Sequence, residues 1–520
     1  MPIRLLQVPA LRLRSGTKRS KQPIGVWRVE GSILLLFLLS APLTAATPYF
    51  EWTPTARAAY EKVIQLRFRE GNNLLQRLET EEPDNYIRLH IANYRDFFTV
   101  YINEDQDEFQ RLEANKEERL RLIRTADQSS PYYLYLQADI RLHWALARLK
   151  FEEYPTAFFE VNKAYKLLKQ NEARFPDFVP NRKDLGILHA IVGTIPDNYK
   201  WGVELLSALE GDFAQGRREL EEVIAYAQHN DFIFEEEIYV LYAYLMLHLG
   251  KNDEAAWKVI NESSLDPQVS PMACFIQANI AMRTGRNDEA VRLLQNRPSG
   301  RVFHPFPYLD FMLGVALMRR LDPAAEAALL RFTRNFGGRN FIKEAYQRLA
   351  WIALLDDRPE AYDRYMQLVK WKGYTVVSTD ESALRNALDG VKPHPELLRA
   401  RMLFDGGYHQ RAYERLTAID RATLPTEHLR VEALYRTGRA LQELRQYPEA
   451  LTIYEQVIAE GSALPWYYAC RAAIERGHIY EAMGQRQSAR RAFERALAIK
   501  PDEHKTGLHQ MAKAGVGRVR

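Results

Sequence analysis

Cysteine is nearly missing from this sequence: Cys274 and Cys470 are the only two among 520 residues. Neither is part of a Cys-x-x-Cys pair, and no His-Glu-x-x-His motif occurs. The chain therefore offers no basis for a disulfide framework or for a zinc site of these types. A buried free thiol is the expected state of Cys274, because a cysteine at a packing position behaves as a small apolar residue.

Recognisable catalytic motifs are missing as well. The sequence has no Gly-x-Ser-x-Gly elbow, no phosphate loop ending in Gly-Lys-Ser or Gly-Lys-Thr, and no dinucleotide fingerprint. His189 is the most interesting histidine because it lies between Gly186 and Gly193, but a structural role is the better interpretation. The acidic run 235–237 is expected to favour a helix N-terminus rather than to bind a metal. The sequence thus predicts a protein that is not an enzyme and has no cofactor or metal.

An excess of positive charge is lacking once the first 46 residues are set aside. Those residues hold seven basic side chains and one acidic side chain, so they contribute 7 − 1 = +6 to the formal net charge of +4. The rest of the chain then carries +4 − 6 = −2. A nucleic-acid-binding protein needs a basic surface, so this class is excluded.

Residues 1–46 have the layout of a secretory signal peptide. A basic leader is followed by the apolar run Ile33-Leu-Leu-Leu-Phe-Leu-Leu39 and then by small residues up to Ala46. The run is too short to cross a membrane comfortably. We expect export, with cleavage near Ala46, to the periplasm or cell envelope of a gram-negative bacterium. An uncleaved anchor is the alternative, and peripheral attachment to a membrane stays open.

The strongest positive feature is an internal repeat. Gly250-Lys-Asn-Asp-Glu-Ala255 and Gly285-Arg-Asn-Asp-Glu-Ala290 begin 35 positions apart, and looser copies begin at 211, 320, 356, 407, 445 and 484. Such a period is typical of a two-helix unit with its turns. An apolar helix over about 236–249 precedes the first string, glycine ends it, and Asn and Asp open the next helix.

The last copies resemble the tetratricopeptide repeat (TPR) family. Its small, aromatic and proline positions are matched by Gly477, Tyr480, Gly484, Ala489, Phe493, Ala496 and Pro501, and one repeat earlier by Gly438, Tyr447, Ala450 and Tyr454. Ala473 and Leu434 depart from the pattern at the first aromatic position. The resemblance spans about 200–501 and implies an all-α, right-handed superhelical solenoid of TPR-like hairpins. Unrelated helical hairpins of similar length are the alternative.

The expected organisation follows from the repeats and their interruptions. A signal peptide (1–46) precedes an N-terminal cap of irregular helices (47–130), a solenoid (131–505) and a basic tail (506–520). One cap helix is expected from 53 to about 70, and insertions are expected at 172–200 and 371–392. The first insertion lacks helical period before a short helix at 185–192, and the second has a brief extended segment before a helix at 381–388 that Asp380 caps. Residues 175–216 are weakly similar to the tetratricopeptide repeat protein 39 family (inclusion-body clearance type), which implies shared architecture only.

A solenoid of this kind forms a concave groove lined by the first helix of each hairpin. The repeat register places the following residues there: Glu237, Tyr244, His248, Phe275, Asn279, Arg283, Tyr435, Arg439, Gln442, Arg471, His478 and Glu481. Aromatic and charged side chains together suit a peptide or protein segment. The leading hypothesis is therefore a non-enzymatic scaffold that binds a protein partner in the cell envelope.

The rival hypothesis uses the first insertion, about 175–201. Its polar and aromatic residues, Asn181, Lys183, Asp184, His189 and Trp201, could converge beside the groove. The protein would then handle a small molecule or lipid, or be an enzyme without a recognisable motif. A closed pocket that holds His189, Lys183 and Asp184 together favours this rival.

Overall fold

The structure is a computed structural model that describes residues 47–192 and 210–519. Within these ranges the chain is helical and has no β-strand; Tyr49 and Asn85 form an isolated bridge. Helices α1 to α7 are Pro54–Ile64, Phe68–Glu81, Ile87–Asn103, Gln106–Ile123, Tyr132–Lys150, Tyr154–Arg174 and Pro180–Val192. Helices α9 to α17 are Phe213–Ala227, Glu235–His248, Asp253–Glu262, Pro271–Arg283, Asn287–Gln295, Tyr308–Arg319, Ala325–Asn335, Ile342–Leu355 and Pro359–Trp371. Helices α18 to α25 are Ser378–Asp389, Pro395–Asp405, His409–Thr417, Glu427–Glu443, Tyr447–Gly461, Tyr468–Ala482, Arg486–Ala498 and Lys505–Arg518, and a short 3-10 helix, η2 (Arg421–Thr423), precedes α21.

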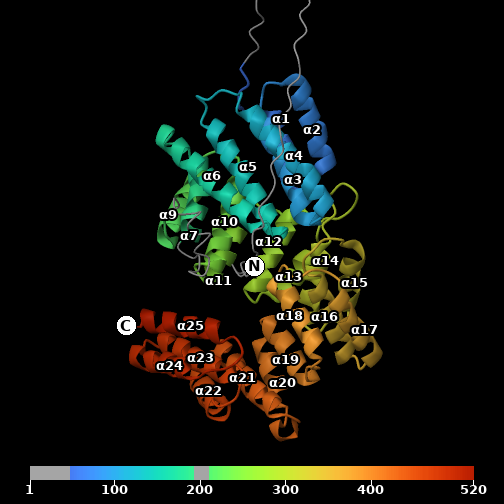
Figure 1. Cartoon of the computed structure of the whole chain (residues 1–520), viewed down its shortest axis with the longest axis vertical. Helices are drawn as coiled ribbons and strands as arrows, with labels where there is room; N and C mark the ends of the chain where they lie inside the picture. Colours follow the sequence, from blue (N-terminus) through green and yellow to red (C-terminus); the bar gives the residue numbers. More distant parts are fainter. Residues whose placement is uncertain (1–46, 193–209, 520) are drawn as a thin grey trace, which may run out of the picture.

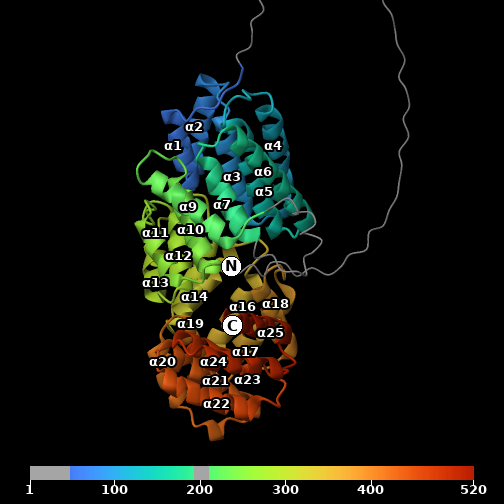
Figure 2. The same cartoon turned by 90° about the vertical axis from the view of Figure 1, so that its left-hand side faces the viewer.

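The helices form hairpins that follow one another along the molecule, from the blue N-terminal end to the red C-terminal end (Figures 1 and 2). The pairs are α5 with α6, α7 with α9, α10 with α11, α12 with α13, α14 with α15, α16 with α17, α19 with α20, α21 with α22, and α23 with α24. The first helix of each pair also contacts the first helix of the next, so the first helices form one continuous layer. This layer is called the concave face below. The predicted all-α solenoid of TPR-like hairpins is confirmed.

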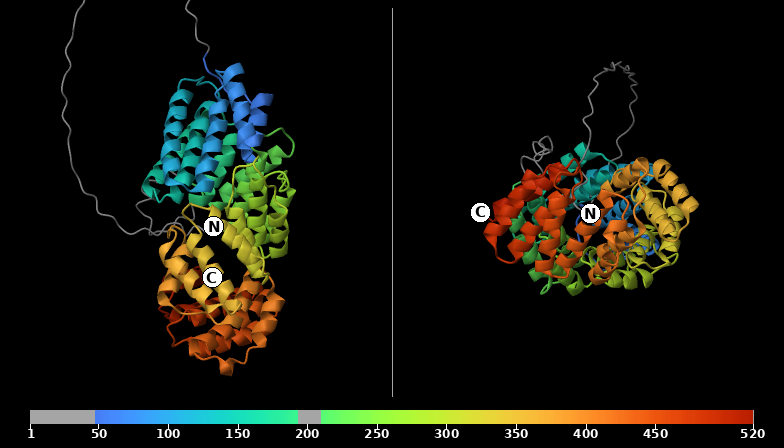
Figure 3. Two further views of the ribbon diagram at one scale, coloured as in Figure 1. Left: turned by 90° about the vertical axis from the view of Figure 1, so that its right-hand side faces the viewer. Right: turned by 90° about the horizontal axis from the view of Figure 1, so that it is seen from below.

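The winding brings distant hairpins into contact. Glu104, at the turn after α3, accepts hydrogen bonds from the backbone N–H groups of Arg339 and Asn340 at 3.0 and 2.8 Å. Gly407 approaches Gly285 so closely that a Cβ at position 407 would lie 2.2 Å from the carbonyl oxygen of Gly285. In the view from below in Figure 3, the ribbon curves from red through orange to yellow in one arc. The concave face is therefore partly enclosed by the protein itself.

The small residues of the repeat make room for aromatic rings. A Cβ at Gly477 would lie 2.4 Å from Phe493, and a Cβ at Gly438 would lie 2.7 Å from Tyr454. Phe493 and Tyr454 are fully buried at these contacts. The expected cap also forms, because the Asn252 side chain accepts a hydrogen bond from the Ala255 N–H at 3.0 Å.

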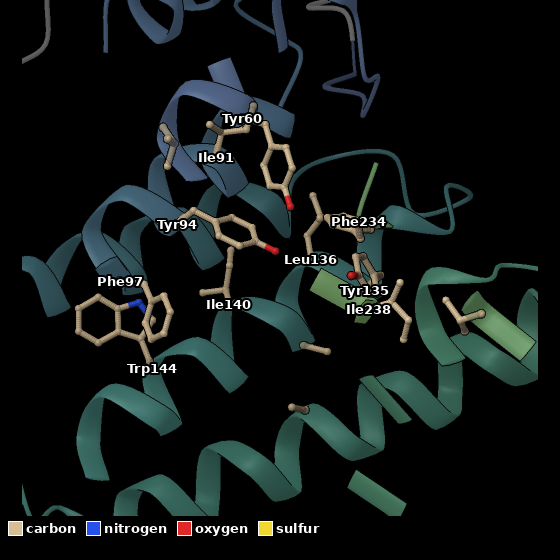
Figure 4. Close-up of a cluster of buried hydrophobic side chains, with 14 of the residues drawn as sticks. Tyr60, Ile91, Tyr94, Phe97, Tyr135, Leu136, Ile140, Trp144, Phe234 and Ile238 are labelled. Carbon is tan, nitrogen blue, oxygen red and sulfur yellow. The ribbon is translucent and has the colours of Figure 1, made fainter. Parts of the chain in front are cut away.

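The N-terminal helices are more broken than the sequence predicts. A helix was expected from 53 to about 70, but α1 ends at Ile64 and α2 begins at Phe68. Leu66 between them has a φ of 61°, a left-handed conformation that cannot continue a right-handed helix. Aromatic residues fill the core behind these helices, and Figure 4 shows the hydroxyls of Tyr60 and Tyr94 turned toward the same interior region.

Both insertions also differ from expectation. Helix α7 begins at Pro180, five residues before the helix expected at 185, so part of the segment expected to be irregular is helical; proline suits a first helical position because the N–H it lacks has no partner there. Asp380 lies inside α18 instead of capping it. Its carboxylate accepts hydrogen bonds from the backbone N–H groups of Phe341 and Glu344 at 2.6 and 2.8 Å, so it caps α16 from a distance.

The C-terminal segment is not a free tail. Residues expected to form a basic tail fold into α25, where Leu508 and Ala512 are buried against α23 and α24. This helix covers the end of the last repeat, a role that terminal elements of solenoids usually have. Both cysteines are free and buried, as expected for Cys274.

Two predictions concern parts that lie outside the described residues. These are the signal peptide at 1–46 and the side chain of Trp201. Among the helices of the described ranges, none combines the length and the apolar character that a membrane span requires.

Candidate functional site

A cavity of about 630 Å³ lies on the N-terminal half of the concave face. Helices α3, α5, α7, α10 and α12 contribute to it, together with α6. Its wall is mostly apolar and includes Phe97, Phe98, Leu142, Leu149, Phe158, Val161, Ile187, Leu188, Val240, Leu241, Phe275 and Ile276. A volume of this size falls within the range of small-molecule sites.

One end of the cavity is polar, with Lys183 at its centre. The Lys183 Nζ lies 2.8 Å from Glu237, 2.9 Å from Asp184 and 3.5 Å from Asp139. Burial disfavours the charge of Lys183, but the carboxylates of Asp184 and Glu237 outweigh it and raise the pKa of this lysine well above its usual value. Three helices, α5, α7 and α10, thus meet at one buried cation.

Two of the carboxylates are held ionised by further partners. Asp139 contacts His90 at 2.7 Å and His143 at 3.6 Å. Burial alone would raise the pKa of Asp139, yet His143 and Lys183 lower it well below its usual value. The hydroxyls of Tyr60 and Tyr94 donate to Glu237, whose pKa is also lowered, against burial, chiefly by Lys183.

The two other carboxyl groups at this end behave in the opposite way. Burial raises the pKa of Asp184 to about 8. Burial, followed by repulsion from Glu235, raises the pKa of Glu236 to about 7. The polar end therefore combines ionised carboxylates with carboxyl groups that hold a proton near neutral pH, and groups with such shifted pKa values often mark functional sites.

The residues of the first insertion separate into different environments. Lys183 and Asp184 line the cavity, as the rival hypothesis requires. His189 does not: its Nδ1 lies 2.6 Å from Glu219, and Gly211 packs against its Cβ. The Asn181 side chain bonds to Asn171 and to the Leu168 carbonyl, which is a structural role. The pocket therefore brings together two of the three residues proposed to meet there.

The predicted groove residues of the N-terminal hairpins lie on or beside this cavity. Glu237, Tyr244 and Phe275 line it. The Tyr244 hydroxyl donates to Asn279 at 3.3 Å, and Asn279 also accepts a bond from Arg283 at 3.2 Å. The ring of His248 stacks on Tyr244, with ring centroids 5.8 Å apart. These side chains connect the cavity to the next part of the concave face.

The predicted groove residues of the last hairpins surround a carboxylate that the sequence did not single out, Glu475. Glu475 is buried and lies 2.6 Å from Arg471, 3.3 Å from His478 and 3.8 Å from Arg439. Gln442 donates to it at 3.0 Å. Burial would raise the pKa of Glu475, but His478 and the two arginines lower it far below its usual value. We call this arrangement the Glu475 cluster.

Two other predicted groove residues have different surroundings. Tyr435 is buried in the hydrophobic core among tyrosine rings, so it packs the interior and offers little surface to a partner. Glu481 pairs with Arg518 of α25 at 2.7 Å, so the terminal helix occupies its carboxylate.

A row of arginines joins the cavity to the Glu475 cluster, and the sequence analysis missed most of it. Successive first helices contribute Arg283, Arg319, Arg348, Arg401 and Arg436. Arg348 pairs with Glu344 at 2.7 Å, Arg436 pairs with Glu432 at 2.6 Å, and Arg401 lies 3.8 Å from Asp405. Burial lowers the pKa of Arg319 and Arg401 although Arg401 keeps 41% of its side-chain exposure. Arg401 thus lies on an enclosed surface that solvent still reaches. The row has more arginines than acids.

The repeat register could have revealed this row, since each arginine belongs to the first helix of a hairpin. Asp139 and His143 offered no such signal, because they come from α5, ahead of the clear repeats. No group of histidine, cysteine and acidic side chains able to hold a metal ion occurs within 47–192 and 210–519.

The fold and the concave face define a helical-repeat protein of the kind that binds partners along one surface. Family models of the tetratricopeptide repeat match residues 432–460 and 470–503, which are the α21–α22 and α23–α24 hairpins. The chain therefore carries tetratricopeptide repeats, as the resemblance implied, and these repeats support a protein-interaction scaffold. The finer similarity to the tetratricopeptide repeat protein 39 family stays a prediction.

This chain aligns over most of its length with chains of two solved structures. The APC/C hetero-tetramer Cut9-Hcn1 is 11% identical, with 89% of this chain and 95% of that chain covered and a TM-score of 0.23. The TPR domain of P58(IPK) is 13% identical, with 82% and 99% covered and a TM-score of 0.19. No curated protein matches the chain.

Proposed function

We propose that the protein is a non-enzymatic scaffold that binds an extended, acidic segment of a partner protein along the arginine row of its concave face. The observation that carries this proposal is the excess of arginine over acid on consecutive first helices. An acidic segment gains charge-assisted hydrogen bonds from guanidinium groups that already lie on an enclosed surface. The arginines of the Glu475 cluster are less available, because they are paired with a buried carboxylate. Within the row, Arg348 and Arg436 are likewise paired with Glu344 and Glu432, so the segment would meet mainly Arg283, Arg319 and Arg401.

A labelled peptide of glutamate and alanine, compared with one of lysine and alanine, tests the proposal by fluorescence anisotropy. We expect the acidic peptide alone to bind, and to bind more weakly as salt increases. The double variant Arg319→Glu, Arg401→Glu should lose at least about tenfold in affinity. The matched control is Arg385→Glu, Arg490→Glu, which reverses two exposed arginines outside the concave face. Equal binding of both peptides, or an unchanged double variant, contradicts the proposal.

We propose further that the protein acts in the periplasm or cell envelope of a gram-negative bacterium, where it is exported by its N-terminal segment. The basic leader, the apolar run and the small residues up to Ala46 support this location. Sequencing the N-terminus of the protein purified from its source tests it. Cytosolic protein with residues 1–30 intact contradicts export, and envelope protein with an intact leader supports the uncleaved anchor instead.

A second candidate function is the binding of an apolar small molecule in the cavity. The favouring observation is the cavity itself, with its apolar wall and its single polar end. We expect an apolar fluorescent dye to bind the full chain with one site. Leu142→Trp, which places a ring inside the cavity, should abolish the binding, while Leu451→Trp in α22 should not. A dye that binds the Leu142→Trp variant unchanged argues against this function.

A further inference from the structure

The polar end of the cavity contains a buried oxygen that the protein itself leaves unused. Asp184 Oδ1 lies 2.9 Å from Lys183, but Asp184 Oδ2 has no hydrogen-bond partner among the residues that the structure describes. Only 3% of Asp184 is exposed, and an unpaired polar atom at such a position destabilises the protein. A ligand whose head group reaches Asp184 would relieve this cost.

The charges around Asp184 decide which head group fits. Lys183 already lies within 3.5 Å of the ionised carboxylates of Asp139 and Glu237, so its charge is neutralised by the protein even while Asp184 holds its proton. An anionic head group would meet more carboxylates than cations and would be repelled. A cationic head group would meet the opposite balance.

We propose that the cavity binds an amphiphile with an apolar body and a primary amine head, and that Asp184 Oδ2 is the partner of the ammonium group. The apolar body lies against the side chains of α5, α7 and α10, and the ammonium group donates to Asp184. This inference rests on the second function proposed above and adds the chemical class of the ligand.

Other titratable groups face Asp184 and shape its response to pH. They come from each helix packed on this end of the cavity: Lys183 from α7, Tyr135, Asp139 and His143 from α5, and Glu236 and Glu237 from α10. His90 and Tyr94 of α3 lie behind Asp139 and Glu237. On the α9 side of α7, Glu219 faces His189 and not Asp184.

Binding of an amine should release a proton. The pKa of Asp184 is raised to about 8 by burial, so the carboxyl is protonated at pH 7 when the cavity holds no amine. A primary alkyl amine, like a lysine side chain, keeps its own proton up to a pH of about 10. The Asp184 proton must therefore leave when the ion pair forms. Affinity should rise roughly tenfold per pH unit up to about pH 8 and then level off, and Glu236 adds a rise in the same direction at lower pH.

Isothermal titration calorimetry of the full-length chain with dodecylamine, dodecanol and dodecanoate, each below its aggregation concentration, tests the proposal. At pH 8 we expect dodecylamine to bind at least about tenfold more tightly than dodecanoate, with dodecanol between them. Lengthening the amine by one methylene should tighten binding roughly fourfold until the cavity is full. Only the amine should show the rising pH profile.

A variant pair sharpens the assignment of Asp184. Asp184→Asn should reduce the preference for the amine and flatten its pH profile near pH 8, above the range in which Glu236 contributes, while leaving dodecanol binding unchanged. Arg182→Gln, one position earlier on α7 at a surface ion pair, is the matched control and should behave as the unchanged chain. If Asp184→Asn fails to fold, the pH series on the unchanged chain still decides.

The outcomes separate the inference from the function on which it rests. Equal affinity for the three probes, tighter dodecanoate, or an amine affinity that is flat with pH overturns the amine head group and leaves the apolar cavity as a ligand site. Failure of all three probes to bind overturns both.

Discussion

The concave face holds buried carboxylates in two regions, and the two regions stabilise them differently. At the cavity, Asp139 and Glu237 share one lysine, Lys183; His90 and His143 also contact Asp139, and the hydroxyls of Tyr60 and Tyr94 donate to Glu237. In the Glu475 cluster a single carboxylate has several basic neighbours, among them Arg439 and Arg471. Acid exceeds base in the first region, and base exceeds acid in the second.

The difference follows from what surrounds each region. Apolar walls keep water away from the cavity end, so Asp184 and Glu236 hold protons rather than charges. The Glu475 cluster faces a more open surface, where Arg471 keeps 26% and His478 keeps 33% of the side-chain exposure. One layer of first helices can therefore offer an enclosed acidic site at one end and a basic surface at the other.

The largest expected effect on stability comes from removing Lys183, the central cation of the cavity end. Removing Arg471 from the Glu475 cluster provides the comparison. Lys183→Met leaves Asp139 and Glu237 buried without their lysine, and breaking a buried pair in this way costs about 3–5 kcal/mol. Arg471→Met should cost about 1 kcal/mol or less, because Arg439, Gln442 and His478 still contact Glu475 and Arg471 is partly exposed. Urea denaturation of both variants measures the free energy of unfolding. Equal losses would mean that the two regions do not differ as described.

The next effect is a contrast in pH dependence. Asp184 binds its proton more tightly in the folded than in the unfolded chain, so between about pH 5 and pH 7 the folded state carries more protons. Stability should then fall as pH rises, by up to about 1.4 kcal/mol per pH unit from this group. Glu475 has a lowered pKa, so its contribution is present near neutral pH and is lost as pH falls below about 4.5.

Matched amides isolate the two contributions. Asp184→Asn should reduce the fall in stability between pH 5 and pH 7, to which Glu236 and Asp380 also contribute, and leave the acid limb unchanged. Glu475→Gln should flatten the acid limb and leave the upper range unchanged. Thermal unfolding across pH 3 to 9 measures both, and a variant that changes the other limb would contradict the assignment.

Local signals made the fold predictable from the sequence. The 35-residue spacing relates neighbouring hairpins, and the Asn252 cap and the glycines at 438 and 477 each act within one hairpin, so these signals could be read without knowing the rest of the chain. The structure departs from prediction where a distant partner decides. Asp380 caps α16 and not its own helix, because the backbone N–H groups of Phe341 and Glu344 are brought to it by the tertiary fold.

Only part of the candidate site could be predicted from the sequence. Lys183 and Asp184 attracted attention as charges in an unusual segment, but grouping them with His189 ignored the period of a helix. At about 100° per residue, positions five and six apart lie on clearly different sides of α7, so His189 faces Glu219 while the other two face the cavity. Asp139 and Glu237 could not be joined to them, because no local pattern relates α5 and α10 to α7.

The smallest effect should come from the ion pair at the C-terminal end of the molecule. Arg518 of α25 bonds to both carboxylate oxygens of Glu481, but 48% of its side chain is exposed, so Arg518→Ala should cost less than about 1 kcal/mol. Leu508→Ala in the same helix removes a buried side chain and should cost about 2 kcal/mol or more. Urea denaturation of the two variants compares them under one condition. If Arg518→Ala proved the more damaging, the C-terminal end would depend on charge, as the cavity end does on Lys183, and not on the buried apolar side chains of α25.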